Sequence, residues 1–162
     1  MDEVEEILGI LQDGRVEEAV SKAFKSKDKK AVSECFSDFA VSLRKDNLDE
    51  FGDAEILLKA AAKLDPKSAQ IRFNLGVFLS ESGVLEKDSR YTNDAVVYYL
   101  EAINLDPKLV AAHYNLGLVY AYLGLFEEAE KEWETIQDIG GDKVGDYAGL
   151  RKLLDYKKVV SK

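Results

Sequence analysis

His113 and Cys35 are the only histidine and the only cysteine of the chain, and they are the first candidates for chemistry. A histidine can act as a general acid or base near neutral pH, and a cysteine can act as a nucleophile once its thiolate is stabilised. Only Lys29 and Lys30 could favour a thiolate at Cys35, and no histidine lies near Cys35 in the sequence pattern. His113 lies three residues before Leu116, on an apolar helical stripe. We therefore expect both residues to be structural and the chain not to be an enzyme.

Motifs that hold a phosphate, a dinucleotide, zinc or calcium are missing from the sequence. One cysteine cannot form an internal disulfide or a metal site made of two cysteines. Paired carboxylates such as Glu127-Glu128 are abundant, but negative charge is typical of exposed helix starts, where it favours the helix dipole. The sequence predicts no cofactor and no metal.

Two landmarks recur at the same interval along the chain. Leu75-Gly76 recurs as Leu116-Gly117, and Asp65-Pro66 recurs as Asp106-Pro107. Both intervals are 41 residues (116 − 75 and 107 − 66). The agreement of two independent landmarks in one register indicates an internal repeat.

The full pattern of the repeat extends over two helices and a turn. Its last copy reads Leu116-Gly117-x2-Tyr120, then Gly124-Leu125-Phe126-Glu127-Glu128-Ala129, then x3-Trp133, and the preceding copy reads Leu75-Gly76-x2-Leu79, Gly83, Ala95-x3-Tyr99 and Pro107. This pattern resembles the tetratricopeptide repeat (TPR), a helix-turn-helix unit of about 34 residues. The resemblance implies an all-α fold, a right-handed superhelical stack of antiparallel helix hairpins, with about three repeats over residues 33–141.

The interval of 41 residues exceeds the family period by about seven residues. They must lie between Gly83 and Ala95, the landmarks that flank the variable stretch. We expect a longer turn there, because the entropy of loop closure increases only slowly with length.

The landmarks divide the chain into five parts of one expected domain, residues 1–162. These parts are a partial repeat or N-terminal cap (1–30), a degenerate repeat (33–66), a repeat with an insertion of seven residues (69–107), a regular repeat (110–141) and a C-terminal capping helix (142–162). The capping helix is expected because a repeat array must cover its last apolar face. Tyr147, Leu150 and Leu154 supply a matching apolar stripe.

Charge and hydropathy argue against nucleic-acid and membrane partners. The chain carries 22 Lys and Arg against 31 Asp and Glu, a net charge of −9, which repels a phosphate backbone. Basic stretches at Lys25 to Lys30 and from Arg151 to Lys162 leave an RNA-associated role as a distant alternative. The acidic start and the lack of an apolar run of about 18 residues indicate no membrane partner, and we expect a cytoplasmic protein.

Stacked hairpins expose their first helices on a concave wall, and proteins of this family commonly hold a peptide or a partner helix there. On each first helix the residues of the Leu-Gly motif lie on one helical face. The resemblance places the concave wall on the face beside it, and we call this surface the predicted wall. Its members are Gln70, Phe73, Asn74, Val77, Glu81, Ala111, Tyr114, Asn115, Leu118 and Tyr122. The resemblance therefore implies a non-enzymatic adaptor or scaffold that binds a protein or peptide in the concave groove.

Residues 110–122 are apolar on both of their stripes, so something is expected to cover the second one. A partner could do so, the C-terminal segment could fold back, or two copies could form a homodimer. A structural or self-associating module with a self-filled groove is thus the alternative to an adaptor. A clamp for chaperone C-terminal carboxylates is not expected, because Ser37, Val41 and Ala111 replace three of the polar residues that such a clamp needs.

Overall fold

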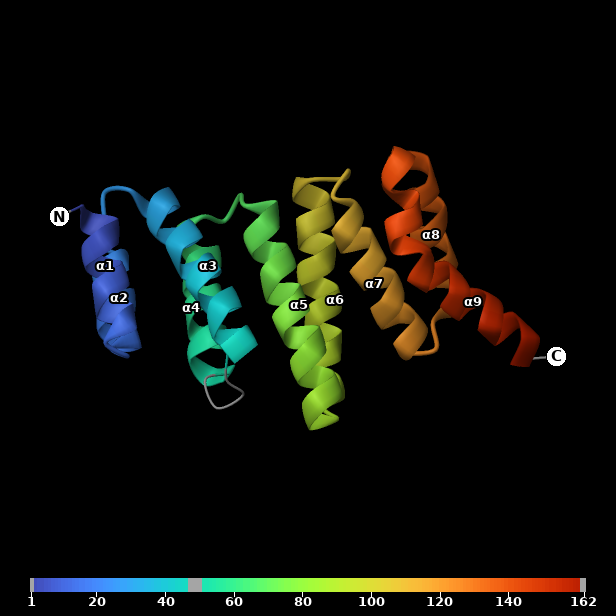
Figure 1. The fold of residues 1–162 in the computed structure, drawn as a ribbon, viewed down its shortest axis with the longest axis horizontal. Helices are drawn as coiled ribbons and strands as arrows, with labels where there is room; N and C mark the ends of the chain where they lie inside the picture. The colour runs from blue at the N-terminus through green and yellow to red at the C-terminus, as the bar shows by residue number, and fades with distance from the viewer. Residues whose placement is uncertain (1, 47–50, 161–162) are drawn as a thin grey trace. The chain divides into compact units, whose positions relative to one another are not determined.

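The computed structural model describes residues 2–46 and 51–160, and these residues form helices and no strand. The expected all-α fold is confirmed (Figure 1). The chain divides into two compact units, Met1–Leu75 and Gly76–Lys162. The division falls within helix α5, Ala69–Glu86, so this helix contributes its first turns to one unit and the rest to the other.

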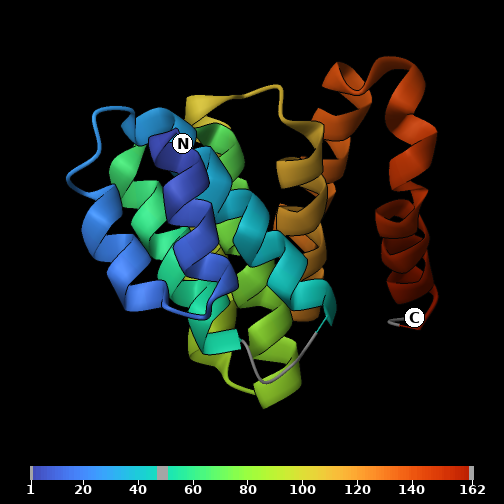
Figure 2. The same cartoon turned by 60° about the vertical axis from the view of Figure 1, so that its left-hand side comes forward.

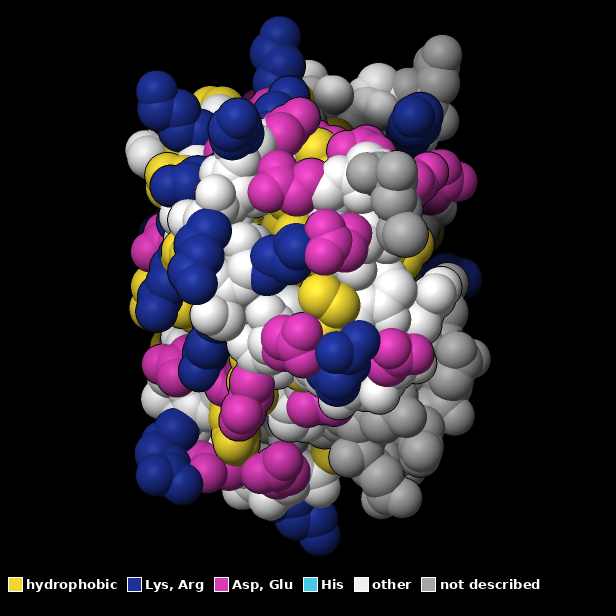
Figure 3. Space-filling model, turned by 90° about the vertical axis from the view of Figure 1, so that its left-hand side faces the viewer, with side chains coloured by type: hydrophobic (Ala, Val, Ile, Leu, Met, Phe, Trp, Pro, Cys, Tyr) yellow, Lys and Arg dark blue, Asp and Glu magenta, His cyan; other side chains and the backbone are white. Residues whose placement is uncertain are grey.

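The first unit begins with a short helical pair, α1 (Glu3–Gln12) and α2 (Val16–Ala23). The turn between them uses Gly14 at a φ of 76°, a conformation that favours glycine. Acidic and basic side chains are interspersed on the outer face of this end of the chain (Figure 3). A polar outer face is what the end of a repeat array requires.

The second pair consists of α3 (Lys29–Asp46) and α4 (Phe51–Leu64). Helix α3 begins four residues earlier than the expected repeat boundary at residue 33, so Lys29 and Lys30 lie in its first turn and not in a connection. The Asp28 carboxylate explains this early start, because it accepts the Ala31 N–H at 3.0 Å and so caps the helix. The core of this unit contains fully buried Ile7, Phe36, Leu57 and Leu58.

The second unit contains the remainder of α5, then α6 (Ser89–Leu105), α7 (Val110–Tyr122) and α8 (Phe126–Ile139). A 3-10 helix, η2 (Gly141–Tyr147), and the last helix, α9 (Ala148–Val160), complete it. Helix α8 ends at Ile139, directly before Gly140 and Gly141. The expected capping helix over residues 142–162 is shorter than predicted, because the chain first forms η2, which starts at Gly141 with a φ of 51°.

The additional residues between Gly83 and Ala95 form helix, which corrects the prediction of a longer turn. Helix α5 continues through Gly83 to Glu86, and only Lys87 and Asp88 separate it from α6. The Asp88 carboxylate accepts the Arg90 N–H at 2.9 Å and caps α6. As a result α5 has 18 residues whereas α7 has 13. The tip of the α5–α6 hairpin extends beyond the end of α7 in Figure 1.

Glycine permits this continuation, because the backbones of α5 and α6 meet at Gly83. A Cβ atom at Gly83 would lie 2.9 Å from the Thr92 backbone nitrogen and closer still to its Oγ1. Gly76, seven residues earlier on the same helical stripe, has the same role. A Cβ there would lie 2.8 Å from ring carbons of Tyr99, which is 1% exposed. Gly76 therefore allows Tyr99 of α6 to pack closely against α5.

We predict that Gly76→Ala destabilises the protein whereas Gly9→Ala does not. The new methyl group would press on the buried Tyr99 ring, and overpacking of this kind costs about 1–3 kcal/mol of the free energy of unfolding. Gly9 lies inside α1, where a Cβ atom would have no neighbour within 4 Å, so alanine should stabilise by about 0.5–1 kcal/mol there. Urea unfolding followed by circular dichroism measures both effects. Equal midpoints for the two variants would contradict the close contact between α5 and α6.

Candidate functional site

The predicted wall is distributed over both units. Gln70, Phe73 and Asn74 belong to the first unit, and the other members belong to the second. In the first unit the Asn74 side-chain amide donates to Ser37 Oγ at 2.8 Å and accepts from Gln70 Nε2 at 2.9 Å. Both polar ends of Asn74 are thus engaged within the chain. A partner that used Asn74 as a hydrogen-bonding group would have to replace one of these bonds.

In the second unit the wall residues of α7 differ in exposure. Ala111, Tyr114, Asn115 and Leu118 are half-buried, whereas the Tyr122 side chain is 62% exposed. Val77 on α5 is half-buried as well, and Glu81 is exposed. Tyr122 is therefore the member of the predicted wall that presents a large aromatic surface.

The C-terminal segment covers Tyr114. The Tyr114 ring lies 5.1 Å from the Tyr147 ring at an interplanar angle of 55°, a favourable tilted arrangement. A Cβ atom at Gly149 would lie 2.8 Å from the Tyr114 hydroxyl, so the first turn of α9 passes close to this side chain. Leu118 packs against the apolar cluster to which α9 contributes. Of the three possible covers for this face, the folded-back C-terminal segment is the one that the structure contains.

Helix α9 contacts both α7 and α8 (Figures 1 and 2). It packs into an apolar cluster whose buried members are Ala121, Ala129, Trp133, Ile136, Leu150 and Leu154. Leu150 reaches α7 at Gly117, where a Cβ atom would lie 2.5 Å from a Leu150 methyl carbon. The C-terminal helix is thus closer to Gly117 than α8 of the same hairpin, whose Glu132 would lie 3.3 Å from that Cβ atom.

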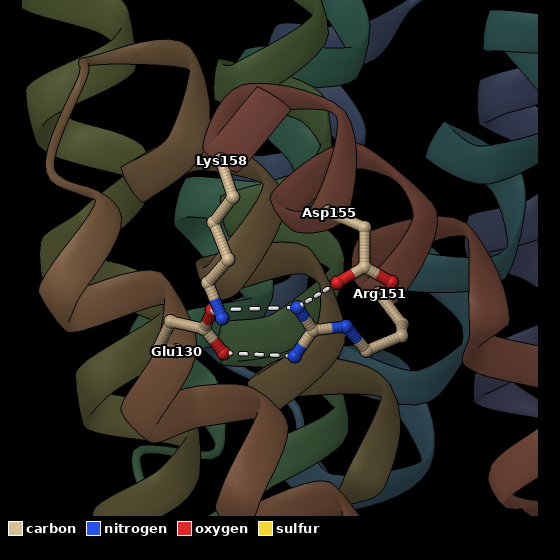
Figure 4. Close-up of polar contacts among 4 residues, drawn as sticks. All are labelled: Glu130, Arg151, Asp155 and Lys158. Carbon is tan, nitrogen blue, oxygen red and sulfur yellow. Dashed lines mark hydrogen bonds and ion pairs between the residues drawn. The ribbon is translucent and has the colours of Figure 1, made fainter. Parts of the chain in front are cut away.

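Ion pairs join the outer side of α9 to α8 (Figure 4). Arg151 Nη1 lies 3.0 Å from Glu130 Oε2, and Lys158 Nζ lies 2.7 Å from Glu130 Oε1. Arg151 also pairs with Asp155 of its own helix. Partial burial would raise the pKa of Glu130, but hydrogen bonds from Lys158 and Arg151 outweigh it and hold the pKa below its usual value. Glu130 is thus a negative anchor for two cations that lie two turns apart on α9.

We predict that Glu130→Gln loosens α9 without unfolding α7 and α8. Loss of the charge leaves Arg151 and Lys158 without this partner, and a partly exposed network of this kind is worth about 1 kcal/mol, or about fivefold in the opening equilibrium. Hydrogen–deuterium exchange of amides 148–160 should accelerate by that factor. The matched control is Glu134→Gln, on the exposed side of the same helix. Unchanged exchange in α9 would contradict this assignment.

His113 joins α7 to α8 and to the preceding connection. Its Nδ1 lies 2.6 Å from Glu132 Oε2, and its Nε2 lies 3.0 Å from the Pro107 carbonyl oxygen. Both neighbours are acceptors, so only the protonated imidazolium can donate to both. Burial alone would lower the pKa of His113, but these hydrogen bonds and the Glu132 charge together raise it above 6.5. This environment agrees with the structural role predicted for His113.

The raised pKa of His113 predicts a pH-dependent stability. A group whose pKa is higher in the folded state contributes stability below its unfolded value of 6.5 and loses it as the pH increases through the folded value. The free energy of unfolding of the wild type should therefore decrease above pH 6.5, whereas His113→Gln should lack this decrease. Below pH 6.5 the variant should be less stable by about 1.5–3 kcal/mol, the range for a charge-assisted hydrogen bond. Urea titrations at several pH values, with the His113 proton resonance followed by NMR, measure both; a depressed histidine pKa would contradict the assignment.

Cys35 is half-buried, and burial followed by the nearby Asp38 charge raises its pKa. The side chain is therefore held as a thiol, which is unreactive. Among the described residues no group of three or more His, Cys, Asp or Glu side chains is arranged to hold a metal ion. No helix within the described ranges is long and apolar enough to cross a membrane.

Sequence reasoning missed several residues that shape this site. The partners of Glu130 were not identified, although Arg151 and Lys158 are seven residues apart and so share one helical face. Glu132, the partner of His113, follows it by 19 residues, and only the hairpin brings the two together. Val84 and Leu85 were assigned to a turn, but they lie on α5 with 55% and 60% of their surfaces exposed.

Comparisons with known proteins agree with this fold. Residues 92–124, which include most of α6 and all of α7, match the family model described as TPR repeat. No curated protein sequence matches the chain. Of the solved structures, a human IFIT1 dimer with PPP-AAAA is similar at a TM-score of 0.65 with 18% identity, over 91% of this chain and 34% of that one. The chain thus spans about a third of that protein.

Two further structures are similar over more of their own length. A crystal structure of MamA has a TM-score of 0.57 and 25% identity, over 89% of this chain and 75% of that one. YrrB, described as a TPR protein with an unusual peptide-binding site, has a TM-score of 0.58 and 22% identity, over 92% of this chain and 69% of that one. The sequence match at residues 92–124 and the fold shared with these structures confirm the predicted resemblance to tetratricopeptide-repeat proteins.

Proposed function

We propose that this protein is a non-enzymatic adaptor that binds a segment of a partner protein against the wall formed by its first helices. TPR-like folds generally mediate protein–protein interaction, which supports the class of function. One observation carries the proposal for this chain. Tyr122 remains 62% exposed on α7, a helix whose sequence contains no Lys, Arg, Asp or Glu.

An exposed aromatic side chain on an uncharged helix has a physical use in binding. Tyrosine is enriched among the residues that dominate binding energy, because it buries a large rigid surface and keeps a hydroxyl for hydrogen bonding. On the same predicted stripe, Tyr114 is covered by the C-terminal segment, and Leu118 packs against the apolar cluster of α7, α8 and α9. The stripe therefore has a closed part and an open part, and the proposed contact is made at the open part near Tyr122.

The packing of the C-terminal segment on Tyr114 favours a second candidate function. This candidate is a structural module whose groove is filled by its own C-terminal segment. It would use α9 to complete the stack and would need no partner on this face. An RNA-associated role has less support. Arg151 and Lys158, two of its basic residues, are engaged by Glu130, and PPP-AAAA belongs to the IFIT1 structure, with which the likeness is one of fold alone.

We predict that Tyr122→Ala abolishes capture of the partner while leaving the fold intact. Loss of an aromatic anchor typically costs about 2 kcal/mol of binding free energy, or about thirtyfold in affinity. Affinity purification with quantitative mass spectrometry should show proteins that wild type enriches and the variant does not. The matched control is Val97→Ala, because Val97 is 51% exposed on α6, a second helix that does not contribute to the predicted wall.

The two candidate functions give different results in this experiment. If Tyr122→Ala and Val97→Ala enrich the same proteins as wild type, the adaptor proposal for this face is wrong. Melting temperatures of the three proteins should agree closely, because both side chains are mainly exposed.

A further inference from the structure

The longer α5 adds an exposed apolar turn at the height where α7 has already ended. Val84 and Leu85 lie on this turn with 55% and 60% of their surfaces exposed. In the sequence register of 41 residues Glu81 corresponds to Tyr122, which is the last residue of α7. Residues 82–86 therefore extend α5 by more than one turn beyond the end of its counterpart.

Helical periodicity places Val84 on the stripe of the predicted wall. Gly76 and Gly83, seven residues apart, both face α6, as their contacts with Tyr99 and Thr92 show. Val77 and Val84 each follow one of these glycines by one residue, so they share the adjacent stripe. Val77 is a member of the predicted wall. Val84 therefore continues the wall on the additional turn.

The neighbouring surface at the end of α7 is also apolar. Tyr122 is 62% exposed, and Leu125, in the turn that follows, is 43% exposed. In the 41-residue register Leu125 corresponds to Val84. Exposed apolar side chains thus occur at the ends of two successive first helices in this unit. Single exposed apolar residues are common on protein surfaces, but a group of them marks an interaction surface.

The charge of the second unit is strongly uneven. Residues 76–142 carry 13 Asp and Glu against 4 Lys and Arg, a net charge of −9, whereas residues 143–162 carry 2 against 6, a net charge of +4. Glu86 and Glu127 are exposed next to the apolar side chains of the two helix ends. Lys87 follows Glu86 directly in the sequence, and Lys157 and Lys158 line the same surface hollow as Glu127, with Lys157 5.0 Å above the Phe126 ring. The acidic excess of residues 76–142 as a whole favours a positively charged partner.

Helix α9 shows how this unit accepts such a partner. It is a basic amphipathic helix that inserts Leu150 and Leu154 into the apolar cluster and places Arg151 and Lys158 on Glu130. Helix α9 therefore already combines buried apolar side chains with ion pairs to an acidic residue of this unit. The open part of the wall has exposed apolar side chains as well, and the part of α5 in this unit adds the exposed acidic residues Glu81 and Glu86.

We infer that the wall of the second unit continues onto the additional turn of α5 through Val84, and that it takes a basic amphipathic helix of a partner protein. This inference rests on the proposed function and specifies the chemistry of the partner. Apolar residues at every third or fourth position of the partner would lie against Val84 and Tyr122. Its Lys or Arg residues would lie near Glu86 on the additional turn.

Synthetic helices test this inference with the full-length protein. One amphipathic peptide carries leucine at every third or fourth position and lysine elsewhere, and two matched peptides carry glutamine or glutamate in place of lysine. Fluorescence anisotropy should rank the affinities as lysine, glutamine, glutamate, with at least about tenfold between the extremes at low salt and less at high salt. Val84→Ser and Tyr122→Ser should each weaken the lysine peptide about tenfold. Val97→Ser on α6 is the matched control and should change nothing.

The outcomes separate this inference from the proposed function. Equal affinity for lysine and glutamate peptides, still lost in Tyr122→Ser, would overturn the basic partner but leave an adaptor that binds at this wall. Loss in Tyr122→Ser but not in Val84→Ser would overturn the extension of the wall. A dimer of the wild type that Val84→Ser dissociates in sedimentation would show a second copy there and overturn the inference. If none of the three peptides binds in a way that requires Val84 or Tyr122, the inference is overturned as well. The proposed function would then be tested by the affinity purification with Tyr122→Ala alone.

Discussion

Tight contact between helices at glycine positions determines which faces of this protein are buried and which are open. Gly76 lets the Tyr99 ring lie against the α5 backbone, and Gly117 does the same for Leu150 of α9. A side chain at either position would separate the helices. Because the stripe that contains these glycines must face a neighbour, the adjacent stripe faces away from it. The position of the candidate binding wall therefore follows from a packing constraint and not from a feature of the wall itself.

The C-terminal helix uses the same constraint to close part of the wall. Packing of Leu150 on Gly117 brings η2 and the start of α9 over Tyr114, and the pairs of Arg151 and Lys158 with Glu130 hold the helix on its outer side. Tyr122, two turns after Tyr114, stays exposed. The acidic charge of residues 76–142 and the basic charge of the segment that follows explain why this helix docks here. They also indicate what kind of additional helix the rest of the surface would accept.

The repeat and its helices could be predicted from the sequence, because the Leu-Gly and Asp-Pro landmarks have direct local causes in packing and helix termination. Gly83 was misread because the same residue type serves a turn in one repeat and a close helix contact in the next. The contact of Thr92 with Gly83 in the folded protein shows that Gly83 serves the helix contact, and this contact cannot be read from the sequence. From the sequence, the C-terminal segment was one of three candidates for covering Tyr114, and the sequence could not decide among them. The answer depends on whether Tyr147 and Leu150 reach α7 or remain exposed.

A photoreactive phenylalanine derivative in place of Tyr122 tests the central claim most directly, because it keeps an aromatic ring at this position and reports on what lies against the open part of the wall in the intact protein. We expect ultraviolet-dependent crosslinks to a distinct partner protein, mapped by mass spectrometry to a basic amphipathic segment. The same photoreactive residue in place of Val97, on α6, should not form these crosslinks. Crosslinks from position 122 only to α9 of the same chain, or no difference between the two positions, would contradict a partner-binding wall at Tyr122.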